Sequence, residues 1–314
     1  MKKVVTIGGG TGSYVVLRGL KSYPLDITAV VSMFDSGGST GVLRDEFGVL
    51  PPGDIRRCLV ALSDGEQAEI LRKLFNYRFN GGTGLNGHSF GNLFLVALAA
   101  IYGSDIEAIK KASELLDLKG KVLPVSLDKA DLRATLEDGT EIVGEANIDV
   151  PKHNGELEIQ SLSLTAPARI FPETDEAIRS ADLIVFGPGD LYTSTIPNLL
   201  VEGMREALAA SSAKKVFISS LMTKWGETHG YSASDMAKEL LTYAGIPKFD
   251  IAICNTAEAD TQLVEAYALE KKHPVICDEA LNACASEVIT GDFYSEADIA
   301  RHDSDKLAKV LAEL

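Results

Sequence analysis

Short β-branched runs that each end in a glycine-containing or polar turn and lead into a helix recur along this 314-residue chain. The first, Lys-Val-Val-Thr-Ile, ends at Gly8 and precedes helical apolar spacing over residues 14–20. Buried strands that alternate with helices predict a mostly parallel, doubly wound sheet, so the fold class is α/β. Further strands of this kind are predicted at residues 26–33, 182–187, 214–220, 249–255 and 274–279.

Helical apolar spacing fills much of the sequence between the first strands and residue 118. Helices are predicted at residues 52–63, 66–79, 87–103 and 105–118. In residues 87–103 the apolar positions cover most of the circumference, which indicates a buried helix. The Ser-Gly-Gly-Ser-Thr-Gly stretch that follows Asp35 is interpreted as a loop.

The pattern changes to strand-like alternation over residues 119–164. Strands are predicted at 121–127, 132–136, 141–148 and 156–164, with turn signals at Glu137-Asp138-Gly139-Thr140 and His153-Asn154-Gly155. We interpret residues 119–164 as a β-rich antiparallel insertion within a single domain that spans residues 1–314. No internal repeat, low-complexity tract or linker argues for a second domain.

Charge and composition exclude several classes of protein. The formal net charge is −15 and the pI is about 4.8, which disfavours a nucleic-acid polymer as partner. No apolar run approaches the ~20 residues that span a bilayer, and the amino-terminal sequence lacks a signal-peptide pattern. We therefore expect a cytoplasmic protein without membrane insertion. The four cysteines lack CxxC spacing, so a zinc site is not predicted.

The first candidate binding turn is Gly8 to Ser13, which joins the first strand to the first helix. Backbone amides at a helix N-terminus attract anions, and ligands of open α/β sheets bind at the carboxyl ends of strands. The turn does not match the dinucleotide fingerprint GxGxxG, because Ser13 or Val15 occupies the last position. The alternative is a purely structural tight turn. The candidate residues are Gly9, Gly10, Thr11 and Gly12.

The second candidate turn follows the second strand at Asp35. This carboxylate lies 23 residues beyond Gly12, about where a ribose-binding acid sits in nucleotide-binding folds, although it could instead cap its own turn. We predict that this loop and the first glycine turn form two walls of one nucleotide pocket. The other candidates of this region are Gly37, Gly38, Ser39 and Asp54, of which Asp54 could also be a simple helix cap.

Two further turns carry dense polar groups. His88 and Asn92 are four residues apart at the start of the predicted helix 87–103, and we expect them on one helical face. Residues 186–198 follow another buried strand and supply Gly187, Gly189, Asp190, Tyr192 and Thr193. Lesser candidates are the Leu-Met-Thr-Lys-Trp-Gly-Glu-Thr-His-Gly stretch at residues 221–230, and Asn255 with Thr256.

Several catalytic signatures are missing. The sequence contains no GxxxxGK[ST] loop, no GxSxG elbow and no HExxH motif. No Ser/His/Asp set can be assembled from the sequence. The residues therefore indicate a nucleotide or polyphosphate pocket more clearly than they indicate a reaction.

Taken together and in this order, the motifs resemble those of the gluconeogenesis factor (YvcK-like) family, a branch of the 2-phospho-L-lactate transferase (CofD-like) superfamily. The matching stretches run from residue 4 to about residue 312 and include GGGTG, DSGGSTGVLR, LPPGDIRR, GHSFGNL and GPGDLYTSTIPN. The resemblance implies a Rossmann-like three-layer fold and a nucleotide-type ligand such as a UDP-sugar or NAD. It also implies a role in carbon metabolism and cell-envelope growth, and it adds Tyr267 and Arg301 as late contributors to the site.

This chain departs from the family pattern at two positions of the second turn. Where the family has a second aspartate and an arginine, the chain has Ser36 and Val42. The loss of a carboxylate weakens the case for magnesium, whose remaining candidate ligand is Asp35, and the loss of the arginine removes a phosphate clamp. Arg44 and Arg56 are the candidate substitutes.

We therefore expect a nucleotide-sugar-binding regulatory protein that controls cell shape and carbon metabolism. One alternative is a 2-phospho-L-lactate-type transferase that acts on a nucleoside-diphosphate-linked donor, with Asp35 and Asp54 as its candidate catalytic residues. A second alternative is an NAD-binding protein. A homo-oligomer is expected, and a regulatory protein partner stays open.

Overall fold

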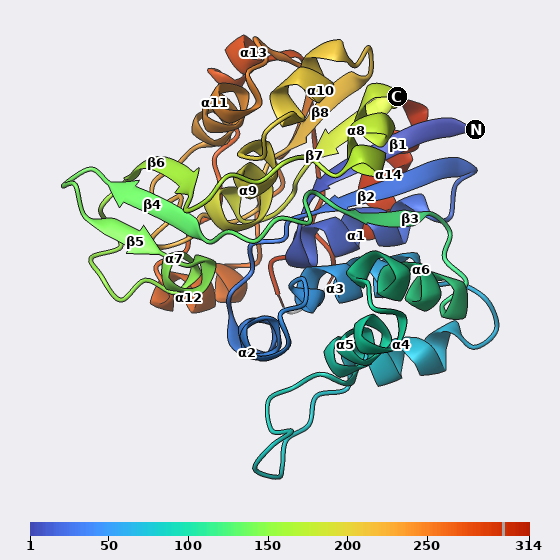
Figure 1. Ribbon diagram of the computed structural model, residues 1–314. Coiled ribbons are helices and arrows are strands. Elements are labelled where there is room, and N and C mark those ends of the chain that lie inside the picture. The colour runs from blue at the N-terminus through green and yellow to red at the C-terminus, as the bar shows by residue number, and fades with distance from the viewer. Residues whose placement is uncertain (297–298) are drawn as a thin grey trace.

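A single large sheet organises the computed structural model, which describes residues 1–296 and 299–314 (Figure 1). Its seven strands all pair in parallel and helices cover both faces, so the predicted three-layer α/β/α fold is confirmed. In spatial order the strands are β10 (Ala285–Gly291), β9 (Phe249–Asn255), β8 (Lys214–Ile218), β7 (Leu183–Phe186), β1 (Lys2–Gly8), β2 (Leu25–Val31) and β3 (Lys121–Pro124).

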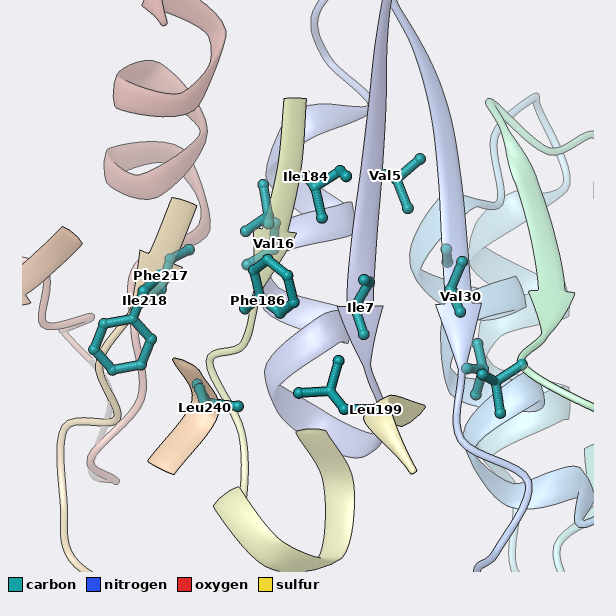
Figure 2. Packing of buried hydrophobic residues seen from close by; sticks show 14 of the residues in the cluster. Val5, Ile7, Val16, Val30, Ile184, Phe186, Leu199, Phe217, Ile218 and Leu240 are labelled. Carbon is teal, nitrogen blue, oxygen red and sulfur yellow. The ribbon is translucent and has the colours of Figure 1, made fainter. Parts of the chain in front are cut away.

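The central strands are buried on both faces, which explains their nearly continuous apolar sequences. Val5, Ile7, Val30, Ile184 and Phe186 are each at most 2% exposed, and Figure 2 shows them along the strands of the sheet. Gly8 pairs with Val31, and Ile7 pairs with Phe186. The carboxyl ends of β1, β2 and β7 therefore lie side by side.

Two groups of helices pack on opposite faces of this sheet (Figure 1). The first group comprises α1 (Gly10–Leu20), α2 (Gly38–Phe47), α3 (Pro52–Leu62), α4 (Ala68–Asn76), α5 (Phe90–Tyr102), α6 (Asp105–Leu115) and α14 (Ser304–Glu313). The second comprises α8 (Pro172–Arg179), α9 (Ile196–Leu199), α10 (Met204–Ala210), α11 (Ala233–Ala244) and α13 (Leu281–Cys284). A π-helical turn, η1 (Leu191–Thr195), follows β7, and α12 (Thr261–Leu269) follows β9.

The antiparallel insertion is a three-stranded sheet in the order β5-β4-β6, with one short helix between β5 and β6 in the sequence. Its elements are β4 (Leu132–Leu136), β5 (Glu141–Val143), α7 (Glu145–Asp149) and β6 (Ile159–Leu164). The predicted turn at residues 137–140 joins β4 to β5, with Gly139 at φ 85° and the Asp138 carboxylate accepting from the Thr140 amide at 2.8 Å. The predicted strand 141–148 is wrong beyond Val143, because Gly144 adopts φ 95° and starts α7.

The insertion is also shorter than predicted. Residues 121–124 form β3, which pairs in parallel with β2 at the edge of the large sheet. The antiparallel part therefore begins at Leu132 and not at residue 119. Strand-like alternation does not tell which sheet a strand joins, and that partner choice is decided by long-range pairing.

Three other local predictions are corrected. Residues 274–279 form only an isolated bridge from Pro274 to Met222, whereas the seventh strand is β10. The glycine-rich stretch after Asp35 is a loop only as far as Gly37, because α2 begins at Gly38. Helix α5 is only partly buried, and Ile101 near its end is 72% exposed. Among the described residues, no helix combines the length and apolar character needed to cross a membrane.

Candidate functional site

The strand order places a cavity at the position where the direction of the winding reverses. From β1 the chain moves outward through β2 to β3, and it then returns to β7 on the other side of β1. Ligands of open α/β sheets bind at this switch point, beyond the carboxyl ends of the strands. A cavity of about 470 Å³ lies there, lined by the turns after β1, β2 and β7, by the start of α3 and by α7 of the insertion.

Three helices begin at this cavity. The first residues of α1, α2 and α3 include Gly10, Gly38 and Gly53, all of which line it. The N-cap positions are Gly9, Gly37 and Pro51, and none of them supplies a side-chain cap. The first amides of a helix have no partner within the helix, and the positive end of the helix dipole lies there. The wall therefore offers the donors that an anionic group needs.

The Ser32 hydroxyl marks the cavity independently of the helix ends. Ser32 follows β2, is only 3% exposed and lines the cavity. Its Oγ has no hydrogen-bond partner within the described chain. Buried polar groups without a partner are uncommon in native proteins, so a ligand atom at this position would complete the hydroxyl's hydrogen bonding.

Asp54 carries a buried carboxyl in the first turn of α3. Burial raises its pKa to about 6, while Arg57, whose Nη1 lies 3.4 Å from Oδ1, and the Gly10 amide oppose the rise. A Cβ on Gly9 would collide with this carboxylate, so the first glycine turn needs glycine there. Asp54 thus packs directly against the β1–α1 turn, and it is more than an exposed helix cap.

Asp35 faces a second carboxyl group across the cavity. Its Oδ1 accepts a hydrogen bond from the Gly37 amide at 2.8 Å, and its side chain is hydrogen-bonded to Glu145 of α7. Burial, followed by the charges of Asp35 and Asp149, raises the pKa of Glu145 far above its usual range. A protonated Glu145 that shares its proton with Asp35 is the arrangement that fits this contact.

The serine that replaces the family's second aspartate has a structural contact of its own. The Ser36 Oγ accepts from the Ala146 amide at 3.1 Å, and the Ser36 amide donates to Glu145 Oε2 at 3.4 Å. Ser36 therefore caps the N-terminus of α7 and ties the insertion to the β2 turn. This contact closes the cavity on the side of the insertion.

The predicted pair His88 and Asn92 meets at Ser39, although not along one helical face. His88 precedes Ser89, the N-cap of α5, so it lies outside the helix. The Ser39 Oγ lies 2.9 Å from His88 Nδ1 and 3.2 Å from Asn92 Nδ2. The Arg56 Nε donates to Asn92 Oδ1 at 3.0 Å, which completes a polar wall.

Arg56 supplies a positive charge at the cavity, whereas Val42 stands where the family has an arginine. Burial lowers its pKa to about 10, so the guanidinium stays charged at neutral pH. Arg56, Arg57 and Arg78 all line the cavity. Arg44, the other candidate substitute, instead pairs with Asp45 and Asp131 at 3.0 and 2.8 Å, away from the cavity.

The turn after β7 packs tightly against the start of α1. A Cβ on Gly12 would overlap the Pro188 carbonyl oxygen, so close approach requires glycine at this position. The peptide bond between Gly187 and Pro188 is cis. This contact sets Gly189 and Asp190 beside the first glycine turn, where both line the cavity.

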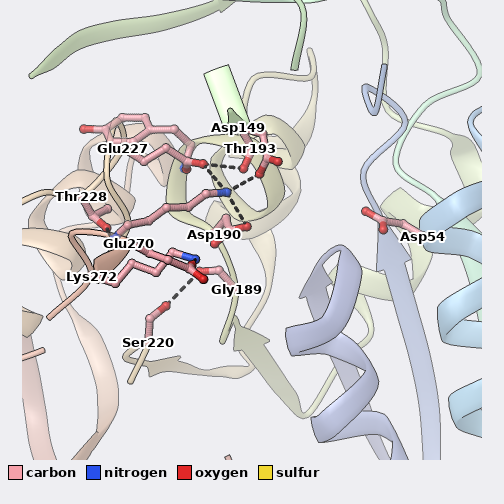
Figure 3. A network of polar contacts seen from close by, with 12 residues as sticks. Asp54, Asp149, Gly189, Asp190, Thr193, Ser220, Glu227, Thr228, Glu270 and Lys272 are labelled. Carbon is pink, nitrogen blue, oxygen red and sulfur yellow. Dashed lines mark hydrogen bonds and ion pairs between the residues drawn. The ribbon is translucent and has the colours of Figure 1, made fainter. Parts of the chain in front are cut away.

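Asp149, Asp190 and Glu227 converge on one ammonium group at the third wall (Figure 3). The Lys224 Nζ contacts Asp149 of α7, Asp190 at 2.8 Å and Glu227 at 2.9 Å. Burial alone would lower the pKa of Lys224, but these three carboxylates together raise it well above its usual range. The three carboxylates lie within 4.8 Å of one another, a spacing that could hold a cation, and the ammonium group already fills that role.

Comparison with known proteins assigns the family. The sequence model described as "2-phospho-L-lactate transferase CofD" matches residues 4–294. The chain belongs to the CofD family. It is 44% identical over 316 residues to the gluconeogenesis factor of Halalkalibacterium halodurans, covering 99% of this chain and 96% of that protein. It is 43% identical to the gluconeogenesis factor of Bacillus subtilis, covering 99% and 98% of the two chains.

Solved structures agree with this assignment. A crystal structure of a Bacillus halodurans protein, described as a member of the UPF0052 family, superposes with a TM-score of 0.93 at 43% identity. It covers 99% of both chains. The Rossmann-like layers of this CofD-family chain are therefore shared with an experimentally determined relative.

A second cavity adjoins the first in this CofD-family chain. Its volume is about 600 Å³, and it shares Thr11, Gly12, Asp149, Val150, Gly189 and Asp190 with the first. Its far side carries aromatic and basic groups, which include both late candidates from the family resemblance. They are Trp225, Tyr267, Lys272 and Arg301.

The structure brings most of the predicted residues to the first cavity and leaves four outside both cavities: His88, which contacts the cavity-lining Ser39, and Gly187, Tyr192 and Asn255. The loops after β1 and β2 both line this cavity. Predicted residues that line the first cavity are Gly9, Gly10, Thr11, Gly12, Asp35, Gly37, Gly38, Ser39, Asp54, Asn92, Gly189, Asp190 and Thr193.

The exceptions have structural roles. Tyr192 is fully buried with its hydroxyl 3.2 Å from that of Tyr231, so its side chain supports η1 from within the core. Gly187 directly follows β7 and adopts φ 75°, a backbone conformation that favours glycine. Asn255 bonds to the Ala257 carbonyl and the Phe293 amide, which makes it a loop-forming residue.

The groups of the site that the sequence did not single out include Ser32, Glu145, Lys224 and Glu227. Lys224 and Glu227 lie in residues 221–230, which had been noted only as a lesser candidate. Glu145 could not be found from sequence because its stretch resembled a strand. Ser32 gave no signal, since an isolated serine at a strand end is ordinary.

Proposed function

We propose that this chain is a nucleotide-sugar-binding regulatory protein, with a UDP-sugar-like ligand held across the two joined cavities. The observation that carries the proposal is the convergence of the α1 and α2 N-termini and the unpartnered Ser32 hydroxyl on one cavity at the switch point. Helix amides and a hydroxyl donor suit a diphosphate. Arg56 and Arg57 add charge to the same wall.

The second cavity suits the rest of such a ligand. It continues from Gly12 and Gly189, so a group bound beside the first glycine turn could extend into it. Arg301 and Lys272 offer donors for hydroxyl or phosphate oxygens, and Trp225 and Tyr267 offer apolar surface. Both cavities fall within the usual range of small-molecule sites, ~300–1,000 Å³.

A regulatory role is proposed from the kind of site and from the relatives. Two relatives that match this chain over 99% of its length are named gluconeogenesis factors. We propose that ligand occupancy links carbon metabolism to cell-envelope growth and cell shape. The polar walls of the site suit recognition of such a ligand.

The residues present fit a tightly bound magnesium ion poorly. Asp35 already accepts from the Gly37 amide and shares a hydrogen bond with Glu145, and Ser36 supplies no carboxylate. Magnesium prefers several oxygen ligands in octahedral geometry, including ionised carboxylates. We therefore favour binding without a metal over the transferase alternative. That alternative would instead need Asp35 and Asp54 around the ion.

Calorimetric titration with a UDP-sugar, in magnesium and in chelator, tests the proposal. We expect binding in both buffers. In Asp35→Asn the loss of one charge-assisted hydrogen bond should weaken UDP-sugar binding by roughly 1.5–3 kcal/mol. The loss should be equal in the magnesium buffer and in the chelator buffer. Asp117→Asn is the matched control, because Asp117 is exposed at φ 46°, a conformation that asparagine tolerates.

Three results would contradict the proposal in different ways. Wild-type affinity that disappears in chelator would favour the transferase. Binding of NAD without binding of any UDP-sugar would favour the dinucleotide alternative. Asp35→Asn affinity equal to that of the wild type would remove Asp35 from the site.

A further inference from the structure

Two of the four cysteines are in contact near the carboxyl end of β9. Cys254 is in the last turn of sequence of that strand, and Cys277 belongs to the extended stretch at residues 274–279. The Cys254 thiol is hydrogen-bonded to Cys277. Cys58 and Cys284 are instead buried in α3 and α13. The fold thus joins two thiols that are distant in the sequence.

Backbone hydrogen bonds at the end of β8 position both of these segments. The Ser219 amide donates to the carbonyl of Ile253, the residue before Cys254, at 3.0 Å. The Val275 amide donates to the Leu221 carbonyl at 2.9 Å, two residues before the second cysteine. The contact between the two thiols therefore follows from paired backbone on both sides.

The two thiols differ in their access to solvent. Cys254 is 1% exposed, whereas Cys277 is half-buried. Cys277 lines a cavity of about 470 Å³ together with Asn255 and Tyr294. The lining of this cavity differs from that of the two cavities proposed to hold the ligand. A small reagent from solvent therefore reaches Cys277 before it reaches Cys254.

Protonation separates the roles of the two sulfurs in the same direction. Burial, followed by the contact with Cys277, raises the pKa of the Cys254 thiol well above its usual range. Cys254 therefore keeps its proton at neutral pH. The thiolate, and not the thiol, is the nucleophile toward oxidants. Exposure and protonation together leave Cys277 as the attacking sulfur and Cys254 as the resolving one.

We propose that Cys254 and Cys277 form a reversible disulfide when the chain meets a hydroperoxide. The Cys277 thiolate attacks a peroxide oxygen and the O–O bond breaks. Cys277 becomes a sulfenic acid, and the other oxygen leaves as water or an alcohol with the proton that Cys277 released. The Cys254 sulfur then attacks the Cys277 sulfur, the S–O bond breaks, and the hydroxyl leaves as water with the Cys254 proton. Two thiols lose two electrons, the peroxide gains them, and a dithiol reverses the reaction.

The disulfide closes residues 255–276 into a loop. This stretch contains α12, every residue of which is at least partly exposed, and it carries Glu270 and Lys272 of the second cavity. Oxidation therefore restrains a segment that packing against the body holds only weakly. The proposed modification does not depend on what either cavity binds.

Hydrogen peroxide treatment of the reduced full chain, followed by thiol blocking, digestion and mass spectrometry, tests the pair. Cleavage after glutamate as well as after lysine and arginine separates Cys277 from Cys284, because Glu279 lies between them. The linkage between Cys254 and Cys277 should be at least about ten times more abundant than any other pair, and dithiothreitol should remove it. A Cys277 that stays a thiol, or that links mainly to Cys284, overturns the proposal.

Substitutions test the two roles separately, with circular dichroism to establish that each variant is folded. Cys254→Ser should stop at a Cys277 sulfenic acid that dimedone traps, and Cys277→Ser should leave Cys254 as a thiol. Cys284→Ser is the matched control and should form the disulfide as the wild type does. Oxidation should raise the melting temperature of the wild type by roughly 5 °C and leave that of Cys277→Ser unchanged. A folded Cys254→Ser variant without sulfenic acid, or an oxidised wild type that melts no higher than the reduced form, overturns the proposal.

Discussion

Replacing Asp54 by asparagine should make the protein more stable near neutral pH. The Asp54 carboxyl is buried and its pKa is raised from 3.8 to about 6, chiefly by burial. A rise of about two units corresponds to about 3 kcal/mol of free energy. Asp54 binds a proton more readily in the folded state than in the unfolded state. Its contribution therefore makes stability fall as pH rises from about 4 to about 6, and the loss is complete at pH 7.

Asparagine cannot ionise, so Asp54→Asn should escape this loss. The attraction of Arg57 for the ionised carboxylate is already contained in the raised pKa, and any cost of the substitution that does not depend on protonation is the same at both ends of the pH range. The decisive quantity is therefore the change with pH of the difference between variant and wild type. Between pH 4 and pH 7 this difference should move in favour of the variant by about 2–3 kcal/mol. In thermal unfolding that corresponds to roughly 4 °C for a chain of this length.

Urea unfolding of both proteins at a series of pH values measures this difference. Asp117→Asn replaces an exposed aspartate and serves as the control. Its difference from the wild type in unfolding free energy should show no comparable change with pH. A difference that stays constant from pH 4 to pH 7 would refute the reasoning, because it would mean that folding leaves the pKa of Asp54 unchanged. A difference that moves in favour of the wild type would show that the charge of Asp54 stabilises the fold.

Three other substitutions test separate parts of the site. Ser32→Ala should change unfolding free energy by less than about 0.5 kcal/mol, since its hydroxyl lacks a protein partner, but should weaken UDP-sugar binding by about ten-fold in calorimetry. Gly12→Ala should push the Pro188 carbonyl away and lower both the melting temperature and ligand affinity, whereas Gly84→Ala, where an added Cβ meets nothing within 4 Å, should change neither. Lys224→Met should cost about 3–5 kcal/mol in urea unfolding, because it leaves Glu227 buried without its cation; an unchanged midpoint would contradict this reading.

The parallel sheet and its ligand-binding edge were predictable because local patterns specify them. Apolar β-branched runs such as residues 3–7 are buried on both faces in α/β folds, and a glycine turn must follow where a helix starts close to a strand. Gly12 is an example: it is glycine because the Pro188 carbonyl leaves no room for a side chain. The same patterns placed the turns after β1, β2 and β7 at one edge.

The errors arose where long-range contacts override local pattern. Residues 274–279 have strand-like sequence but pair only at Pro274, while the half-exposed β10 gains its place by pairing with β9. Glu145 and Lys224 join the site through the insertion and through the loop after β8, which no spacing in the sequence relates to each other. Tyr192 looked like a ligand group because its neighbours are polar, yet its ring packs in the core.

A crystal structure of the chain with a bound UDP-sugar tests the central claim most directly. The account predicts the diphosphate within hydrogen-bonding distance of the α1 N-terminal amides and the Ser32 hydroxyl. The rest of the ligand should extend past Gly189 toward Arg301 and Trp225, without a metal ion between Asp35 and the phosphates. A ligand bound anywhere else, or a diphosphate held through a cation on Asp35 and Asp54, would contradict it.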